Sequence, residues 1–158
     1  MNGGICCITM QMRFFNSPII PVFLMSYGKG CAEEKRGGWI HYGETRFGDC
    51  YFDAKSVSIV KPTIIKVSNK VKYSEAGKDR SIKERIRDNM PTDGWEKLDY
   101  TVFYDEFNCE DKTVKTKKVV DYNDEGEILE DFDFKRSLIE IVVPKSMNDL
   151  LLKQVCHK

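Results

Sequence analysis

The chain has 158 residues, 41% of them hydrophobic, so it is long enough for an ordinary globular core and too apolar for a disordered protein. Its 25 basic and 25 acidic side chains give a formal net charge of zero, which removes the overall field that would attract nucleic acid or an anionic membrane. We therefore expect one domain and no nucleic-acid partner.

Residues 12–32 have the order of a secretory signal: one arginine, then an apolar stretch, then small residues around Cys31. We expect residues 1–32 to be a signal peptide or a disordered N-terminal extension, and residues 33–158 to form a single domain exported to the periplasm or the cell surface. A lipid-modified cysteine needs small or aliphatic residues directly before it, but Lys29 lies in that position before Cys31. This argues against membrane anchoring through a lipid. The alternative is a flexible tail on a cytosolic protein.

Alternation of apolar and polar residues predicts strands through most of the chain. In residues 63–73, Ile65, Val67, Val71 and Tyr73 share one face and lysines occupy the other, which is typical of a half-buried antiparallel strand. Short turns separate the predicted strands, so we expect a meander rather than crossover connections. The other predicted strands cover residues 39–43, 46–53, 56–60, 97–107, 113–122, 127–134 and 137–143.

Two helices interrupt the strands. In residues 79–90, Ser81 and Glu84 have the spacing of a capping box at a helix N-terminus. In residues 146–156, Ser146 can cap a helix whose broad apolar face should pack on the sheet. The predicted fold class is α+β: an antiparallel meander of about six strands, with a short inserted helix and a C-terminal helix.

The cysteines do not have the spacing of a metal site. No Cys-x-x-Cys pair occurs, and with only two histidines we expect no zinc site. Cys109 lies in a predicted turn between two long strands, and Cys156 ends the C-terminal helix. In an oxidising compartment these two could form a disulfide that ties the helix to the sheet, whereas in the cytosol they would be separate structural thiols. Cys50 would stay unpaired in a strand, or would pair with Cys31 or with another molecule.

Basic side chains gather on one face of the strand at 63–73 and on the helix after it. They could form a docking surface for acidic polymers or matrix glycans, although acidic residues are interspersed and a solvated face is the simpler interpretation. The candidate binding residues are Lys66, Lys70, Lys72, Arg80, Lys83 and Arg87.

No catalytic machinery is recognisable. His41 has no serine or cysteine partner motif, and a cysteine hydrolase would have to use Cys50, which no signature surrounds. Residues 121–132 begin like a calcium loop, but Phe132 stands where a bidentate glutamate is needed, so a hairpin turn with Gly126 at positive φ fits better. We therefore expect no enzyme activity, no cofactor and no bound metal.

Residues 39–156 contain several short motifs in a particular order. They comprise Trp39, Tyr51 with Asp53, Lys66, Lys70, Tyr100, Cys109, Tyr122 with Gly126, Pro144 with Ser146, and Val155 with Cys156. In this order they resemble the surface-adhesin protein E family of small exported bacterial proteins. The resemblance implies an antiparallel sheet whose C-terminal helix is tethered by a disulfide, here between Cys109 and Cys156. It also implies adhesion to host cells and to matrix or plasma proteins.

Three features depart from the family pattern: the lipid-attachment motif is missing, Cys50 is extra, and Leu138 or Ile139 replaces an aromatic residue before Pro144. We expect an adhesin-like surface or periplasmic binding protein that acts through protein–protein contacts of an exposed sheet face. Its partners would be host matrix or plasma proteins, or other envelope proteins. The alternative is a periplasmic envelope-associated binding module with no adhesion role. Open sheet edges could also pair two copies in a homodimer.

Overall fold

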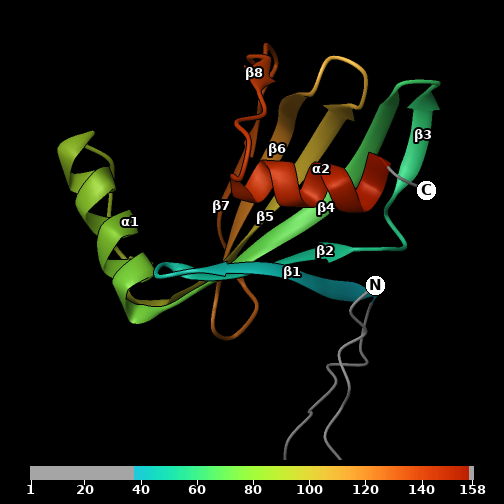
Figure 1. The fold of residues 1–158 in the computed structure, drawn as a ribbon. Helices are drawn as coiled ribbons and strands as arrows, with labels where there is room; N and C mark the ends of the chain where they lie inside the picture. Colours follow the sequence, from blue (N-terminus) through green and yellow to red (C-terminus); the bar gives the residue numbers. More distant parts are fainter. Residues whose placement is uncertain (1–37, 157–158) are drawn as a thin grey trace, which may run out of the picture. The chain divides into compact units, whose positions relative to one another are not determined.

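The computed structural model describes residues 38–156, which form an eight-stranded antiparallel sheet and two α-helices (Figure 1). The predicted signal segment lies outside the described residues. Within residues 38–156, no helix is both long and apolar enough to cross a bilayer. The elements are β1 (Trp39–Thr45), β2 (Gly48–Asp53), β3 (Ser58–Lys61), β4 (Ile64–Tyr73), α1 (Glu75–Arg87), the 3-10 helix η1 (Trp95–Lys97), β5 (Leu98–Asn108), β6 (Thr113–Asn123), β7 (Ile128–Asp133), β8 (Glu140–Ile141) and α2 (Met147–Cys156).

The sheet is the predicted meander. Its main path runs β1-β2-β4-β5-β6-β7, and the three strands β4, β5 and β6 are the longest, with 10 or 11 residues each. Strand β2 pairs with only one end of β4, and the short strand β3 pairs with the other end. In the same way, β7 pairs with one end of β6 and the short strand β8 pairs with its other end. The strands predicted at 56–60 and 137–143 are therefore shorter than expected, since they pair only along the free ends of longer strands.

Helix α2 packs on one face of the sheet, as its apolar pattern predicts (Figure 1). Its N-terminus is capped where expected, because the Asp149 amide donates to Ser146 Oγ at 3.2 Å. The buried residues of the core between α2 and the sheet come from four strands (β2, β4, β5 and β6), from the segment after β8 and from the helix itself. They are Phe52, Val67, Phe107, Val114, Val142, Leu151, Leu152 and Val155.

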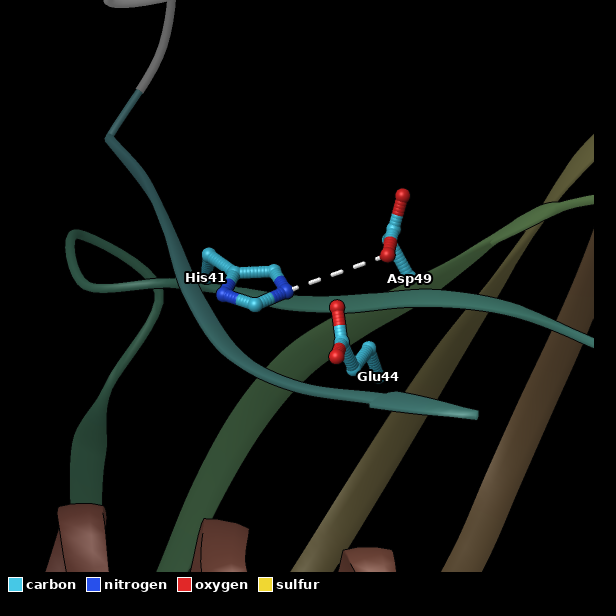
Figure 2. A group of neighbouring side chains, drawn as sticks. All are labelled: His41, Glu44 and Asp49. Atoms are coloured by element: carbon cyan, nitrogen blue, oxygen red, sulfur yellow. Dashed lines mark ion pairs between the residues drawn. The ribbon is translucent and has the colours of Figure 1, made fainter. Parts of the chain in front are cut away.

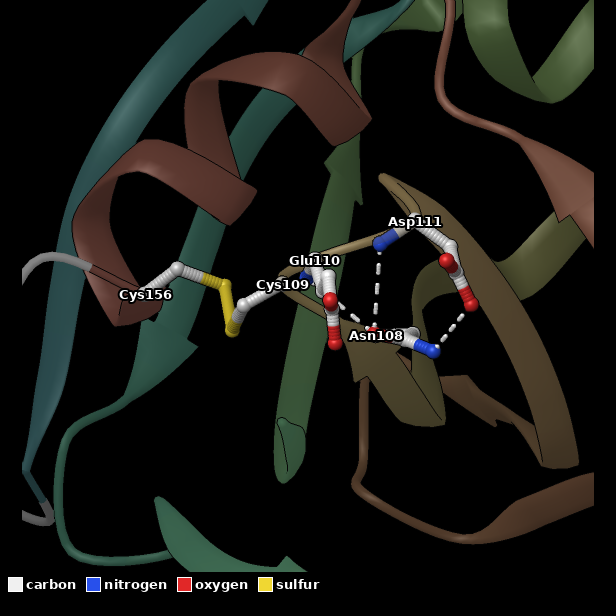
Figure 3. Close-up of a disulfide and its surroundings, with 5 residues drawn as sticks. All are labelled: Asn108, Cys109, Glu110, Asp111 and Cys156. Atoms are coloured by element: carbon white, nitrogen blue, oxygen red, sulfur yellow. Dashed lines mark hydrogen bonds between the residues drawn. A yellow bond between two sulfur atoms is a disulfide. The ribbon is translucent and has the colours of Figure 1, made fainter. Parts of the chain in front are cut away.

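A disulfide joins Cys109 to Cys156 and ties the end of α2 to the turn between β5 and β6, which confirms the predicted pairing (Figure 3). Their Cα atoms lie 5.6 Å apart. Asn108 shapes the turn, because its Oδ1 accepts hydrogen bonds from the amides of Glu110 and Asp111. Cys50 is buried with a free thiol, and burial raises the pKa of that thiol above its ordinary value.

Helix α1 begins at Glu75, four residues before the predicted start, and its N-cap is Ser74. The Ser74 hydroxyl accepts from the Gly77 amide at 3.2 Å and donates to the carbonyl of Arg46 at 2.8 Å. Gly77 also lies against the β1–β2 hairpin so closely that a Cβ atom there would come within 2.0 Å of the Phe47 carbonyl oxygen. The prediction of a capping box at Ser81 was wrong, because contacts with a distant hairpin fix the helix start.

Replacing Ser74 with alanine should lower the free energy of unfolding by about 1 kcal/mol, since the Gly77 amide loses its capping partner. Ser81→Ala is the matched control, because Ser81 lies inside the helix and alanine is a better helix former. Urea unfolding of both variants measures the difference. A larger loss for Ser81→Ala than for Ser74→Ala would contradict this assignment of the cap.

Among the residues that the structure describes, one carboxyl group is buried, that of Asp105, which is 5% exposed. Its Oδ2 accepts from Asn69 Nδ2 at 2.7 Å, whereas its Oδ1 has no hydrogen-bond partner among the described residues. Burial raises the pKa of Asp105 above its ordinary value of 3.8, although hydrogen bonds with Thr116 and Asn69 oppose the shift. The folded protein therefore disfavours the charged form of this side chain.

This burial predicts the sign of a pH effect. Between pH 3.8 and the raised pKa, the folded state holds a proton on Asp105 that the unfolded state has lost, so this group lowers stability as pH rises. The unfolding free energy of Asp105→Asn minus that of the wild type should then increase with pH across this window and level off above it. Asp149→Asn should show the opposite slope, since Lys153 and the Lys145 amide lower the pKa of Asp149. Two parallel, flat difference curves would refute both assignments.

Candidate binding surface on the open face of the sheet

The structure separates the predicted basic residues into two groups. Alternation along β4 places Lys66, Lys70 and Lys72 on the face opposite α2, which we call the open face. Lys66 Nζ lies 3.6 Å from Glu106, and Lys72 Nζ lies 3.9 Å from Asp99. Two of these three cations are therefore paired with carboxylates of β5.

The other three predicted residues lie on α1. Arg80 pairs with Glu84 at 2.8 Å, and its guanidinium also lies over the Phe47 ring. Arg87 pairs with Asp88 at 2.9 Å, and Lys83 is exposed. A binding role for the six residues remains a prediction, and local partners hold four of them.

Lys70 has a different environment. Its Nζ lies 4.7 Å from the centre of the Trp39 ring, 5.4 Å from that of Tyr51 and 5.5 Å from that of Tyr100. At these distances the ring faces attract an ammonium group. Tyr122 extends the group, because its ring stacks on that of Tyr100 with centroids 4.7 Å apart. We call these five residues the Lys70 cluster.

Strand register assembles the Lys70 cluster, because each of its members comes from a different strand among β1, β2, β4, β5 and β6. Tyr51 pairs directly with Lys70, and Tyr100 pairs directly with Tyr122. Burial raises the pKa of both Tyr100 and Tyr122 above the ordinary tyrosine value, so both hydroxyls are neutral at physiological pH. The cluster therefore presents one positive charge within a neutral aromatic surface.

The open face is hollowed beside the cluster. One hollow of about 290 Å³ is lined by four of the five cluster residues together with Asp53, Ser68, Val102 and Tyr104. A second hollow of about 300 Å³ lies next to it, and the two share Ser68 and Tyr104. We call the two adjoining hollows the trough. Ligand sites are usually concave and combine apolar walls with a few polar groups, and the trough has both features.

His41 lies on the edge strand β1 and not in a catalytic arrangement. Its ring contacts that of Tyr51 edge-on with centroids 5.2 Å apart. Its Nε2 lies 4.0 Å from Asp49 Oδ1 (Figure 2). Cys50 adjoins Tyr51 in β2, so its side chain points to the other face, and the structure does not pair it with His41. His41, Glu44 and Asp49 offer donor atoms within 4.8 Å of one another, but all three are exposed and we assign no metal site to them.

Sequence reasoning named Trp39, Tyr51, Lys70, Tyr100 and Tyr122 one by one but did not bring them together. Alternation alone shows that Lys70 faces away from the core. Which rings surround its ammonium depends on the pairing of five strands, and the alternation within one strand shows which face a residue is on but not which residues of the neighbouring strands lie beside it. The available signal was the spacing of aromatic residues on the non-core face of each predicted strand.

Comparison with known proteins agrees with this architecture. The family model described as surface-adhesin protein E matches residues 39–157. Crystal form II of Haemophilus influenzae protein E superposes with a TM-score of 0.50 at 15% sequence identity, covering 77% of this chain and 88% of that one. Protein E from non-typeable Haemophilus influenzae gives a TM-score of 0.49 at 14% identity, covering 77% and 76% of the two chains. No curated protein sequence matches the chain.

At 15% sequence identity, the structural likeness supports only the fold, which is an antiparallel sheet with a C-terminal helix. The family assignment rests on the sequence match, which spans every strand and both helices of the described residues. The chain therefore belongs to the surface-adhesin protein E family.

Proposed function

We propose that this protein is an exported bacterial surface or periplasmic protein that acts as an adhesin through protein–protein contacts of its open face. The Lys70 cluster carries the proposal. Aromatic residues are enriched at protein interfaces, and a partly exposed group of three rings around one cation, with a fourth ring stacked on one of them, is a surface that a partner could cover. Host matrix or plasma proteins are the proposed partners, consistent with the family's description as surface adhesins.

Binding of the purified protein to immobilised matrix, plasma and bacterial envelope proteins tests this function. We expect saturable binding to a matrix or plasma protein, and a loss of at least about tenfold in affinity for Trp39→Ala, a typical effect of removing an interface aromatic residue. Lys153→Ala, which changes an exposed residue of α2 on the other side of the sheet, is the control. Binding only to envelope proteins would replace adhesion with the envelope-associated role.

Export is the second part of the proposal, with residues 1–32 as the signal segment and residues 33–158 as the mature domain. The disulfide supports it, since such bonds persist in oxidising compartments. Intact mass of protein made in its native host, with and without reduction and thiol alkylation, tests it. We expect loss of about the first 32 residues and two thiols that alkylate only after reduction. A full-length mass with all cysteines free would contradict export.

A further inference from the structure

Lys70 differs from its neighbours on the open face in what balances its charge. Lys66, Lys72 and Lys118 each lie within 4.0 Å of a carboxylate, with distances of 3.6, 3.9 and 2.8 Å. Lys70 makes no ion pair within residues 38–156, and three ring faces surround its ammonium instead. Within the described residues, ring faces rather than a paired carboxylate therefore lie against its charge, and ring quadrupoles attract a cation without neutralising it.

We propose that the Lys70 cluster is a docking point for an acidic segment of a protein partner. One carboxylate of that segment meets the Lys70 ammonium, and apolar side chains beside it fill the adjacent hollow. This rests on the proposed adhesin-like function and specifies the chemistry of the partner. The rings hold the ammonium in place before binding, so a carboxylate there would form a charge-assisted hydrogen bond with little loss of side-chain freedom.

The charges around the site favour a single carboxylate over a polyanion. Asp99, Glu106 and Asp131 pair with the neighbouring lysines, and Asp53 lines the hollow itself. Asp53 Oδ1 accepts a hydrogen bond from the Lys55 amide at 3.0 Å, so it already has a role within its own turn. A sulfated or uronate-rich glycan would bring repeated negative charges against these carboxylates. A peptide with one acidic residue between apolar ones would not.

The hollow also fits such a peptide. Besides the cluster residues it is lined by Val102 and by the ring of Tyr104, which supply apolar surface, and by Ser68, which offers a hydroxyl group. Tyr104 and Ser68 continue into the second hollow, so the trough extends beyond the cluster. An extended segment can therefore place its carboxylate at Lys70 and its flanking side chains along the trough.

The test uses two short peptides, acetyl-Gly-Phe-Glu-Phe-Gly-amide and the same peptide with Gln in place of Glu. Each is titrated into isotope-labelled protein while the indole N–H of Trp39 and the ring signals of Tyr100 and Tyr122 are followed by NMR. We expect saturable shifts with the Glu peptide and at least about tenfold weaker binding of the Gln peptide, the usual effect of losing a charge-assisted hydrogen bond. Equal binding of the two peptides, or no saturation by either, would overturn the proposal.

Protein variants provide the matching arm. Lys70→Gln should weaken binding of the Glu peptide by at least about tenfold, whereas Lys70→Arg should retain it because a guanidinium keeps the charge and also stacks on rings. Lys118→Gln, on the same face but paired with Asp131 and lining neither hollow, is the control and should bind within about twofold of wild type. If Lys70→Gln fails to fold, the comparison of the two peptides on wild type decides. Equal losses of binding for Lys118→Gln and Lys70→Gln would overturn the proposal.

A heparin hexasaccharide tests the glycan alternative by NMR on the same Trp39, Tyr100 and Tyr122 signals. Tighter binding of the hexasaccharide than of the Glu peptide would overturn the proposal in favour of a polyanion.

The proposed adhesin function and the proposed docking point at Lys70 can fail separately. Adhesion to a matrix or plasma protein that Lys70→Gln leaves unchanged would support the proposed function and refute the docking point. Glu-peptide binding at Lys70 without any such adhesion would support the docking point and refute the adhesin role.

Discussion

Replacing both Cys109 and Cys156 with serine is expected to lower the free energy of unfolding by about 3–4 kcal/mol. The disulfide closes a loop with a sequence separation of 47 residues, and the chain-entropy model assigns such a loop a large restriction of the unfolded state. The bond also anchors the last residue of α2, whose other end is held by the Ser146 cap. Urea unfolding measures the loss, and hydrogen exchange should show the largest change in α2.

The double variant avoids leaving one free thiol that could form a bond with another molecule. Cys50→Ala is the control, because it removes a buried thiol while the bridge remains. Its cost should be well below that of the double variant, since one small side chain changes and no loop is released. An unchanged unfolding midpoint for the double variant would mean that the bond contributes nothing to the stability of the domain.

Phe107→Ala should destabilise the protein by about 3–5 kcal/mol. Phe107 is completely buried, and it belongs to the core cluster between α2 and the sheet, with Val67 and Val114 of the sheet and Leu151 of α2. Truncation removes the favourable burial of the ring and leaves a cavity that the sheet and the tethered helix can fill only in part. Chemical unfolding monitored by far-UV circular dichroism gives the free-energy change.

Phe132→Ala provides the comparison for this variant. Phe132 lies on β7, is 53% exposed, and makes an edge-to-face contact with Phe134. Its truncation should cost less than about 1 kcal/mol, because little buried area is lost. Similar losses at both positions would place the main core somewhere other than between α2 and the sheet.

Much of the fold could be predicted from local patterns. Alternation in residues 63–73 identified the central strand β4 and the face it buries, and the Asn123–Gly126 segment forms a turn with Gly126 at φ 81°. The end of α2 at Cys156 also followed from local pattern, whereas position in the chain left the pairing of Cys156 open and the family resemblance implied Cys109 as its partner. These predictions succeeded because side-chain periodicity, helix capping and turn formation depend on residues that are close together in the sequence.

Other features could not be predicted in this way. Ser81 has good local capping chemistry, yet the helix starts at Ser74, because the carbonyl of Arg46 and the close approach of Phe47 to Gly77 lie in a hairpin nearly thirty residues earlier. Local preference at Ser81 is weaker than these tertiary contacts. The lengths of β3 and β8 were set in the same way by the free ends of the strands they join.

The sequence by itself determined the pattern of strands, the α2 cap and the face that each long strand buries, because each depends on residue type and on spacing along the chain. The residues left the pairing of Cys109 with Cys156 open, and the family resemblance implied it. Only the tertiary structure decided that Lys70 lies against Trp39, Tyr51 and Tyr100 while nearby lysines face carboxylates. The physical reason is register: bulges in β1 and β5 shift the pairing, and a shift of one residue would turn another set of side chains toward Lys70.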